Sequence, residues 1–313
     1  MHDMIDVLER AFKEDAAGLV ETIPRTTVDI KEKEGWIGIM PAYVEGLHSF
    51  STKIVTLYNN NIEKYKLPTI MATIILNDPE TGKVLSIMDG SLITAMRTGG
   101  IGGVAAKYLS RKDSKTAGIF GAGVQARTQL SALKEVRDIS QVLVYDPLED
   151  RARGFAREMG EKLAIPIKVV SSPVEVIKNS DVIATISTSK VPLFEGKEVK
   201  LGTHISAFGT FRPGEREIDT ETIVRSRVFV DKKEAALSEA GDLIIPIKEG
   251  VFSEAKIAGE IGEVILGSVG GRTSEKEITL FKSVGLGIQD CAAASLAYEK
   301  AMRNHVGTEV NMG

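Results

Sequence analysis

The chain has 313 residues and a mass of 33.8 kDa, a length that predicts two domains or one large domain. Hydrophobic residues make up 43% and charged residues 26%, a globular composition that excludes a disordered or fibrous protein. With 39 basic and 43 acidic residues the net charge is −4. No basic excess points to nucleic acid or to an anionic membrane, so neither is an expected partner.

Cysteine and histidine usage narrows the chemistry further. The single cysteine, Cys291, excludes an internal disulfide framework and a multi-thiolate metal site. The four histidines share no metal-ligand spacing, so no metal site is predicted. No run of 18 apolar residues and no signal-peptide pattern is present, and we therefore expect a soluble, cytoplasmic protein.

The first part of the chain is predicted to form a helix followed by a mostly antiparallel sheet. Apolar residues recur at helical spacing over residues 4–12. Beyond Pro24, short runs rich in β-branched residues indicate strands over residues 36–41, 52–58, 69–76 and 84–88. The turn formers of residues 77–82 separate the last two strands, an arrangement typical of a hairpin.

From about Ser91 onward the pattern changes to alternating helices and strands. A Gly/Ala-rich helix over residues 92–109 leads to a strand at 117–120. Helical and strand patterns then follow at 125–133, 141–145, 150–163, 167–170, 174–178, 182–186, 204–208, 228–230, 278–281 and 290–303. Such alternation predicts parallel strands joined by helical crossovers.

A glycine-rich loop carries the strongest chemical signal. Gly121, Gly123 and Ala126 form a GxGxxA pattern that follows a predicted strand and opens a helix. The first glycine permits the tight turn, the second lets the backbone approach a pyrophosphate, and the alanine allows close helix–strand packing. Because glycine-rich turns also occur for packing alone, the loop is weak evidence by itself.

Asp146 strengthens the dinucleotide interpretation. It ends the next predicted strand, 25 residues after Gly121. A carboxylate in that place accepts hydrogen bonds from both ribose hydroxyls and repels a 2′-phosphate, which favours NAD over NADP. Two arginines nearby, Arg151 and Arg153, keep NADP possible, and Asp146 as a simple turn residue before Pro147 is the alternative.

Several motifs together resemble the ornithine cyclodeaminase/mu-crystallin family, which includes archaeal alanine dehydrogenases and ketimine or cyclic-imine reductases. These motifs are residues 66–69, 92–99, 121–125 and 281–285, and the similarity runs from about Met4 to Val306. The resemblance implies an α/β fold in which a Rossmann dinucleotide-binding domain is inserted into a discontinuous α+β substrate and dimerisation domain. The implied domains are 1–112 for substrate binding and dimerisation, 113–288 for NAD(P) binding, and 289–313 for a C-terminal helix that returns to the first domain. It also implies a homodimer.

The resemblance further implies the site residues. Arg25 and Lys53 correspond to residues that hold the substrate, and Arg97 lies in a motif associated with both the active-site mouth and the cofactor phosphates. An arginine can grip an amino-acid carboxylate in two places. Lys53, flanked by strand-forming residues, is expected in a partly desolvated cleft as the catalytic proton donor and acceptor. The implied cofactor-binding residues are Thr69, Arg97, Thr98, Gly121, Gly123, Val124, Gln125, Asp146, Ser187, Phe208 and Ser283.

Two departures from the cyclodeaminase pattern bear on the reaction. The slot that holds an acid/base aspartate in the cyclodeaminases holds Phe211 here, and phenylalanine cannot move protons. Gly38 stands where the cyclodeaminase has a glutamate. Both changes argue against ornithine cyclodeaminase itself.

The leading hypothesis is an NAD(P)H-dependent oxidoreductase that acts at the α-carbon C–N bond of a small imino or amino acid. Its preferred substrate is a cyclic imine such as pyrroline-2-carboxylate or piperideine-2-carboxylate. Three alternatives stay open: an alanine dehydrogenase, a cyclodeaminase with Glu215 or Glu217 as base, and a non-catalytic dinucleotide-binding protein like mu-crystallin.

Overall fold

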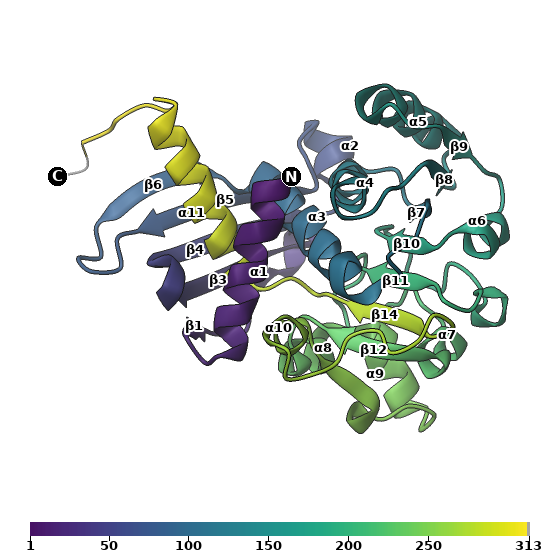
Figure 1. Cartoon of the computed structure of the whole chain (residues 1–313). Helices are drawn as coiled ribbons and strands as arrows, with labels where there is room; N and C mark the ends of the chain where they lie inside the picture. Colours follow the sequence, from purple (N-terminus) through teal and green to yellow (C-terminus); the bar gives the residue numbers. More distant parts are fainter. Residues whose placement is uncertain (312–313) are drawn as a thin grey trace. The chain divides into compact units, whose positions relative to one another are not determined.

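The computed structural model describes residues 1–311 and divides the chain into two compact units (Figure 1). Unit 1 contains Met1–Ile5 and Thr98–Gly285, and unit 2 contains Asp6–Arg97 and the residues from Leu286 onward. The first boundary therefore falls inside a helix, not after it at residue 112. Unit 2 is discontinuous in sequence because the chain leaves it at Arg97 and re-enters it at Leu286. The substrate and dimerisation roles expected for its segments stay predictions.

Unit 2 is built on a six-stranded antiparallel sheet in the order β1-β3-β4-β5-β6. The first half of β3 pairs with β2 and its last residues pair with β1, on the same edge. Its elements are α1 (His2–Ala16), which begins in unit 1, β1 (Val20–Thr22), β2 (Thr26–Ile30), η1 (Lys31–Lys33), β3 (Gly35–Val44), η2 (Glu45–Leu47), β4 (Ser49–Tyr58), α2 (Asn61–Tyr65), β5 (Ile70–Asn77), β6 (Val84–Asp89) and α11 (Gly287–Arg303). The short strands β1 and β2 were not predicted from the sequence.

Strand alternation decides which side chains of unit 2 face the core. Along β4 every second residue, from Ser49 to Leu57, is buried. Helix α11 packs across β3, β4 and β5 (Figure 1). The first half of α11 is buried, and its run Ala292–Ala294 lets the helix backbone approach the strands closely. The buried face of β4 therefore looks toward α11.

The predicted hairpin between β5 and β6 is present. The Asp78 carboxylate accepts hydrogen bonds from the Glu80 N–H at 3.0 Å and from the Thr81 hydroxyl at 2.7 Å. Gly82 closes the turn with a φ of +74°, a conformation that costs glycine little. The turn formers in the sequence thus specify the connection through their own side chains.

Unit 1 is built on an eight-stranded parallel sheet in the order β13-β12-β14-β11-β10-β7-β8-β9. Its elements are α3 (Gly90–Leu109, from Thr98 on), β7 (Thr116–Phe120), α4 (Val124–Val136), β8 (Gln141–Tyr145), α5 (Glu149–Leu163), β9 (Ile167–Val169), α6 (Pro173–Asn179), β10 (Val182–Thr185), η3 (Gly196–Glu198), β11 (His204–Ala207), α7 (Thr220–Arg225), β12 (Ser226–Val230), α8 (Lys233–Glu239), α9 (Gly241–Lys248), η4 (Glu254–Lys256), β13 (Ile257–Glu260), α10 (Ile261–Leu266) and β14 (Ile278–Lys282).

This strand order is the doubly wound Rossmann arrangement. From β7 the chain runs outward through β8 and β9, then returns and runs the other way through β10 and β11. The order reverses between β7 and β10, and ligands of such sheets bind at that point, outside the carboxyl ends of the strands. The predicted insertion of a Rossmann domain into an α+β domain is confirmed.

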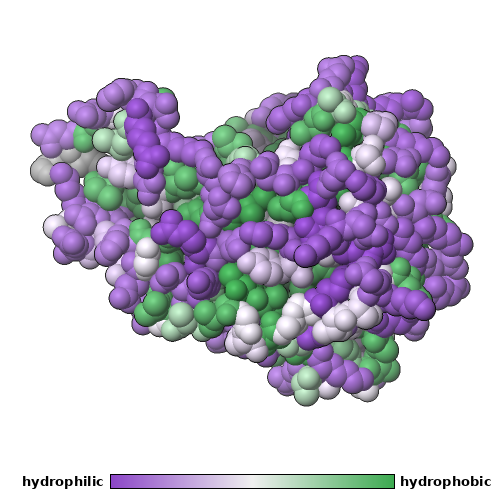
Figure 2. Space-filling view, in the orientation of Figure 1, coloured by the Kyte–Doolittle hydropathy of each residue, from purple (hydrophilic) through white to green (hydrophobic). Residues whose placement is uncertain are grey.

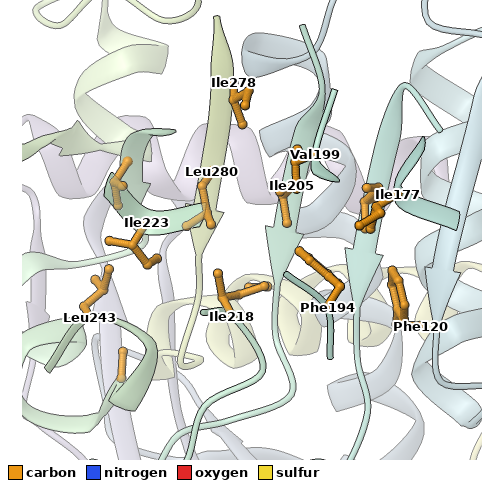
Figure 3. Close-up of a cluster of buried hydrophobic side chains, with 14 of the residues drawn as sticks. Phe120, Ile177, Phe194, Val199, Ile205, Ile218, Ile223, Leu243, Ile278 and Leu280 are labelled. Atoms are coloured by element: carbon orange, nitrogen blue, oxygen red, sulfur yellow. The ribbon is translucent and has the colours of Figure 1, made fainter. Parts of the chain in front are cut away.

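Two apolar clusters cover the two faces of the parallel sheet. Val142 and Val144 of β8 belong to one cluster with residues of α4 and α5, whereas Leu143 belongs to the other. Figure 3 shows the second cluster, in which Ile205 and Leu280 on the strands pack with Ile223 and Leu243 from α7 and α9. Burial on both faces explains why these strands are continuously apolar.

The outer helices of unit 1 carry the polar surface. In Figure 2 the edge where α5 and α6 lie is covered mainly by hydrophilic side chains. Across the described residues 1–311, none of the helices combines the length and apolar character needed to cross a bilayer.

Asp181 ties together the amino ends of β7 and β10, at the edge of the sheet opposite the glycine-rich loop. Its carboxylate accepts the backbone N–H groups of Lys115 at 2.9 Å and Thr116 at 3.0 Å. It also pairs with Lys200 at 2.8 Å and Arg111 at 3.1 Å. Burial opposes ionisation, but these hydrogen bonds outweigh it and lower the pKa of Asp181 to about 2.

We therefore predict that Asp181→Asn destabilises the protein in an acid-dependent way. The depressed pKa contributes stability above the ordinary aspartate value of 3.8, and that contribution is lost as the pH falls toward about 2. With partial exposure taken into account, the loss at neutral pH is about 1–2 kcal/mol. In urea unfolding, the difference in free energy of unfolding between wild type and variant should become smaller below about pH 4. Asp138→Asn, which removes an exposed carboxylate paired with Lys115, is the control and should change stability little. A difference in free energy of unfolding that does not depend on pH would contradict the stabilising role given to the ionised Asp181.

Candidate functional site

Lys53 lies at the centre of a buried charge cluster in unit 2. Alternation along β4 turns it inward, and its side chain is only 2% exposed. Its Nζ lies 2.5 Å from Oδ2 of Asp290, in the first turn of α11. The other oxygen of Asp290 accepts a hydrogen bond from Nε of Arg97 at 3.0 Å, and Arg97 also donates to Gln289. Two cations thus share one fully buried carboxylate.

Burial makes Lys53 a titratable group near neutrality. Desolvation is the largest effect and lowers the pKa of Lys53 from 10.5 to about 7. The negative charge of Asp290 raises the pKa, while the positive charges of Arg97 and Arg25 lower it. An amine with such a pKa can both donate and accept a proton at neutral pH.

Asp290 was not among the residues predicted for the site. The sequence offered one signal, an acidic side chain directly before the small apolar run Cys291–Ala294. A carboxylate at the edge of a buried helix face needs a partner. That partner is on β4, far along the chain, so residue spacing gave no means of finding it.

Arg25 lies on the same face of the sheet as Lys53. The Cδ atom of Arg25 is 3.5 Å from where a Cβ of Gly38 would be, and a Cβ there would meet the Trp36 ring at 2.7 Å. The missing side chain at Gly38 therefore leaves room for the Trp36 ring and the stem of Arg25. A glutamate, as in the cyclodeaminase pattern, would displace them.

The glycine-rich loop of unit 1 has the predicted form. Gly121 adopts a φ of +93°, and a Cβ there would lie 2.8 Å from the carbonyl oxygen of Ile186. Gly123 precedes the first residue of α4, and no atom lies within 4 Å of where its Cβ would be. The amino end of α4, with Val124 exposed and Gln125 half-buried, is thus open above the loop. This is the geometry of an anion site at a helix N-terminus.

Asp146 follows β8 beside this loop. Its two carboxylate oxygens accept the N–H groups of Ala122 and Leu148, each at 2.9 Å. It also lines a cavity of about 430 Å³. The cavity is formed by the ends of β8 and β9 and by the start of α6, with Tyr145, Asp146, Pro147, Glu149, Lys168, Val169, Val170, Ser171 and Glu175 as its lining. The carboxylate thus fixes the loop and faces an open space.

Ser187 and Phe208 lie just beyond the carboxyl ends of β10 and β11; the sequence placed Phe208 as the last residue of its strand, and the strand ends at Ala207. The Ser187 hydroxyl donates to Glu217 at 2.6 Å, and Phe208 packs edge-on against Phe281. Glu217 is fully buried, and burial raises its pKa. Because it accepts four hydrogen bonds, Glu217 is unsuited to the role of mobile base.

The other aligned residues are divided between the units. Ser283 is 2% exposed, and its hydroxyl donates to Asp231 at 2.7 Å. Thr98, in unit 1, accepts a hydrogen bond from Gln129 through its carbonyl oxygen. Thr69, with Arg97, belongs to unit 2 and precedes β5. Their role toward a cofactor stays a prediction.

Phe211, in the slot of the cyclodeaminase aspartate, packs against the apolar cluster of Figure 3. Within residues 1–311, no group of three or more His, Cys, Asp or Glu side chains is arranged to hold a metal ion. The chemistry available therefore consists of a buried lysine–carboxylate pair in unit 2 and a dinucleotide-type loop in unit 1.

Comparison with known proteins identifies the family. The model of the ornithine cyclodeaminase/mu-crystallin family matches residues 1–305. The chain belongs to this family.

Individual relatives match over nearly the whole chain. A Δ1-pyrroline-2-carboxylate reductase of Bacillus cereus is 38% identical, and the alignment covers 99% of this chain and 95% of the relative. The structure of Thermococcus litoralis Δ1-pyrroline-2-carboxylate reductase in complex with NADH and L-proline has a TM-score of 0.95 and 48% identity, covering 98% and 95% of the two chains. An archaeal alanine dehydrogenase dimer with bound NAD has a TM-score of 0.94 and 37% identity, covering 100% and 95%.

Proposed function

We propose that this protein is an NADH-dependent reductase of a small cyclic imine carboxylate, with Δ1-pyrroline-2-carboxylate as the preferred substrate and Δ1-piperideine-2-carboxylate as its larger homologue. The product is the corresponding cyclic amino acid. The observation that carries the proposal is the buried Lys53–Asp290 pair, whose lysine has a pKa of about 7. The full-length similarity to pyrroline-2-carboxylate reductases supports it.

The residues of unit 1 fit a dinucleotide. The open loop at Gly121 and Gly123 and the amino end of α4 suit the pyrophosphate. Asp146, at its cavity, suits the ribose hydroxyls and favours NAD over NADP. Relatives whose structures hold NADH or NAD support the same choice. When bound, the reduced nicotinamide supplies the hydride.

Lys53 is the proposed proton donor. Reduction of a C=N bond adds a hydride to carbon and a proton to nitrogen, and the chain must hold that proton. A lysine with a pKa of about 7 is half protonated at neutral pH and gives up its proton readily. Asp290 keeps the ammonium in place, Arg97 donates to the other oxygen of Asp290, and Gln289 in turn holds Arg97.

Arg25 is the proposed carboxylate ligand. Its charge acts on Lys53, and its stem lies over Gly38 on the same face of the sheet. Arg97 already binds Asp290, so we propose that it assists substrate binding mainly through its positive charge. An arginine fork and a lysine on one face match a substrate whose carboxylate is adjacent to its C=N bond.

Reductive amination of pyruvate is the second candidate. It needs the same carboxylate grip and the same proton donor, and the similarity to an archaeal alanine dehydrogenase supports it. Ornithine cyclisation is less favoured because Phe211 is packed and Glu217 is fully hydrogen-bonded.

A homodimer is also proposed. The sheet face of unit 2 that α11 leaves uncovered exposes Val28, Ile39, Ile54 in part, Leu85 and Ile87. A contiguous apolar face of this kind marks an interaction surface. The archaeal relative forms a dimer, which supports a second copy of the chain as the partner.

The first prediction from the proposed function tests the reaction. Purified protein with freshly prepared Δ1-pyrroline-2-carboxylate should oxidise NADH and form proline, measured by the loss of NADH absorbance and by chiral chromatography. Pyruvate with ammonia should react more slowly, and L-ornithine with NAD should release no ammonia. Inertness toward the imine with both NADH and NADPH would reject the proposal.

A second prediction concerns Lys53 and pH. Lys53→Ala should lower kcat by about 100-fold or more while NADH binding persists. In the wild type the rate of imine reduction should fall as the pH rises above about 7, since the protonated amine is the donor. In Asp290→Asn this fall in rate should begin at lower pH, because Asp290 raises the lysine pKa. Undiminished turnover in Lys53→Ala, or a pH dependence of the rate that is unchanged in Asp290→Asn, would show that Lys53 is not the proton donor.

The dimer gives a third prediction. Ile87→Lys places a charge on the uncovered sheet face and should shift sedimentation equilibrium from dimer toward monomer. Val224→Lys, an exposed apolar position on α7 of unit 1, is the matched control and should leave the dimer intact. A wild-type monomer at micromolar concentration would refute the proposed dimer.

A further inference from the structure

We infer that Glu217 is a positioning residue that sets the shape of the nicotinamide half of the cofactor site, by tying the carboxyl ends of β10 and β11 together. The inference rests on the proposed NADH-dependent function. It assigns to Glu217 no proton transfer and no direct contact with substrate.

The carboxylate of Glu217 accepts four hydrogen bonds from two neighbouring strand ends. From β10 and its continuation come the Thr185 hydroxyl at 2.9 Å, the Ser187 N–H at 2.7 Å and the Ser187 hydroxyl at 2.6 Å. From beyond β11 comes the Gly209 N–H at 2.8 Å. All four partners donate, so the bonds make full use of a group that only accepts.

Gly209 leaves the space that this carboxylate fills. A Cβ built on Gly209 would overlap all three carboxyl atoms of Glu217, far closer than a real Cβ approaches any atom. Glu217 itself has no exposed surface. The acid group therefore stands against the bare backbone after β11, and the two positions are specified together.

A second buried acid fixes the backbone of Glu217. Asp242 accepts the N–H groups of Glu217 at 2.7 Å and Ile218 at 2.9 Å. Its other oxygen lies 2.7 Å from Nζ of Lys282, at the end of β14, and Lys282 in turn donates to the Thr210 carbonyl at 2.7 Å. The network thereby joins the ends of β10, β11 and β14.

The segment that Glu217 holds lies against the glycine-rich loop. A Cβ on Gly121 would be 2.8 Å from the Ile186 oxygen and 3.2 Å from the Ser187 Cα. In a doubly wound sheet, each half binds one nucleotide of a dinucleotide. Asp146 and its cavity lie on the β8–β9 side, so the ends of β10 and β11 serve the nicotinamide half. Loss of the Glu217 network should therefore weaken binding of the nicotinamide half much more than binding of the adenosine half.

Glutamine is the sharpest replacement. It keeps the size of the side chain but turns one acceptor oxygen into an NH₂ donor that faces the N–H and O–H groups now bound. Asp219→Asn is the matched control, because Asp219 also accepts two N–H groups and one hydroxyl, at the start of α7.

The test compares binding of NADH with binding of ADP, which carries only the adenosine half. Titration calorimetry should show that Glu217→Gln lowers the affinity for NADH by about 10-fold or more and changes the affinity for ADP by less than about twofold. The fluorescence enhancement of bound NADH should fall as well. Asp219→Asn should lower the melting temperature yet keep the ratio of the two affinities.

Equal effects of Glu217→Gln on NADH and ADP, or no effect on either, would overturn the inference. If that variant fails to fold, Thr185→Val removes one of the four bonds, and unchanged NADH affinity in it would overturn the inference equally. A wild-type protein that binds no NADH would instead refute the proposed function, so the two failures are distinguishable.

Discussion

The ion pair between Lys53 and Asp290 is the constraint on which unit 2 depends. Removing two charges from water is costly, and the cost is offset only when each charge has close partners. Here the carboxylate is shared by Lys53 and Arg97, and Gln289 holds the arginine. Lys53 is on β4 and Asp290 on α11, so the end of the chain has to return to the first sheet before the pair can form. The discontinuous unit is the form of the fold that makes this chemistry possible.

Buried acids organise unit 1 in a related way. Glu217, Asp231 and Asp242 have no exposed surface. Glu217 and Asp231 bind backbone N–H groups just beyond the carboxyl ends of central strands, and Asp242 binds the backbone of Glu217 itself. Loops in this region connect strands that are otherwise held only by their ladders. The acids replace the missing regular hydrogen bonds and give the ligand-binding edge of the sheet a fixed shape. Asp181 does the same at the opposite edge.

The sequence predicted those features that depend on local pattern. The GxGxxA loop, the hairpin at Asp78 and Gly82, and the inward direction of Lys53 each follow from a few adjacent residues. Short elements such as β2, β13 and α7 were missed, because four to six residues carry too little periodicity. The partners Asp290 and Glu217 were also beyond sequence reasoning, since each acts on residues brought near only by the tertiary fold. Asp290 was absent from the predicted site, and Glu217 was considered only as a base.

The absence of a side chain at Gly38 has a consequence for observing the protein. It allows the Trp36 ring to lie against the backbone beside Arg25, on the face that carries Lys53. Trp36 is the only tryptophan of the chain. All indole emission therefore originates at one place, next to the arginine proposed to receive the substrate carboxylate. The protein contains its own fluorescent reporter, and the arrival of a ligand in unit 2 is observable without any label.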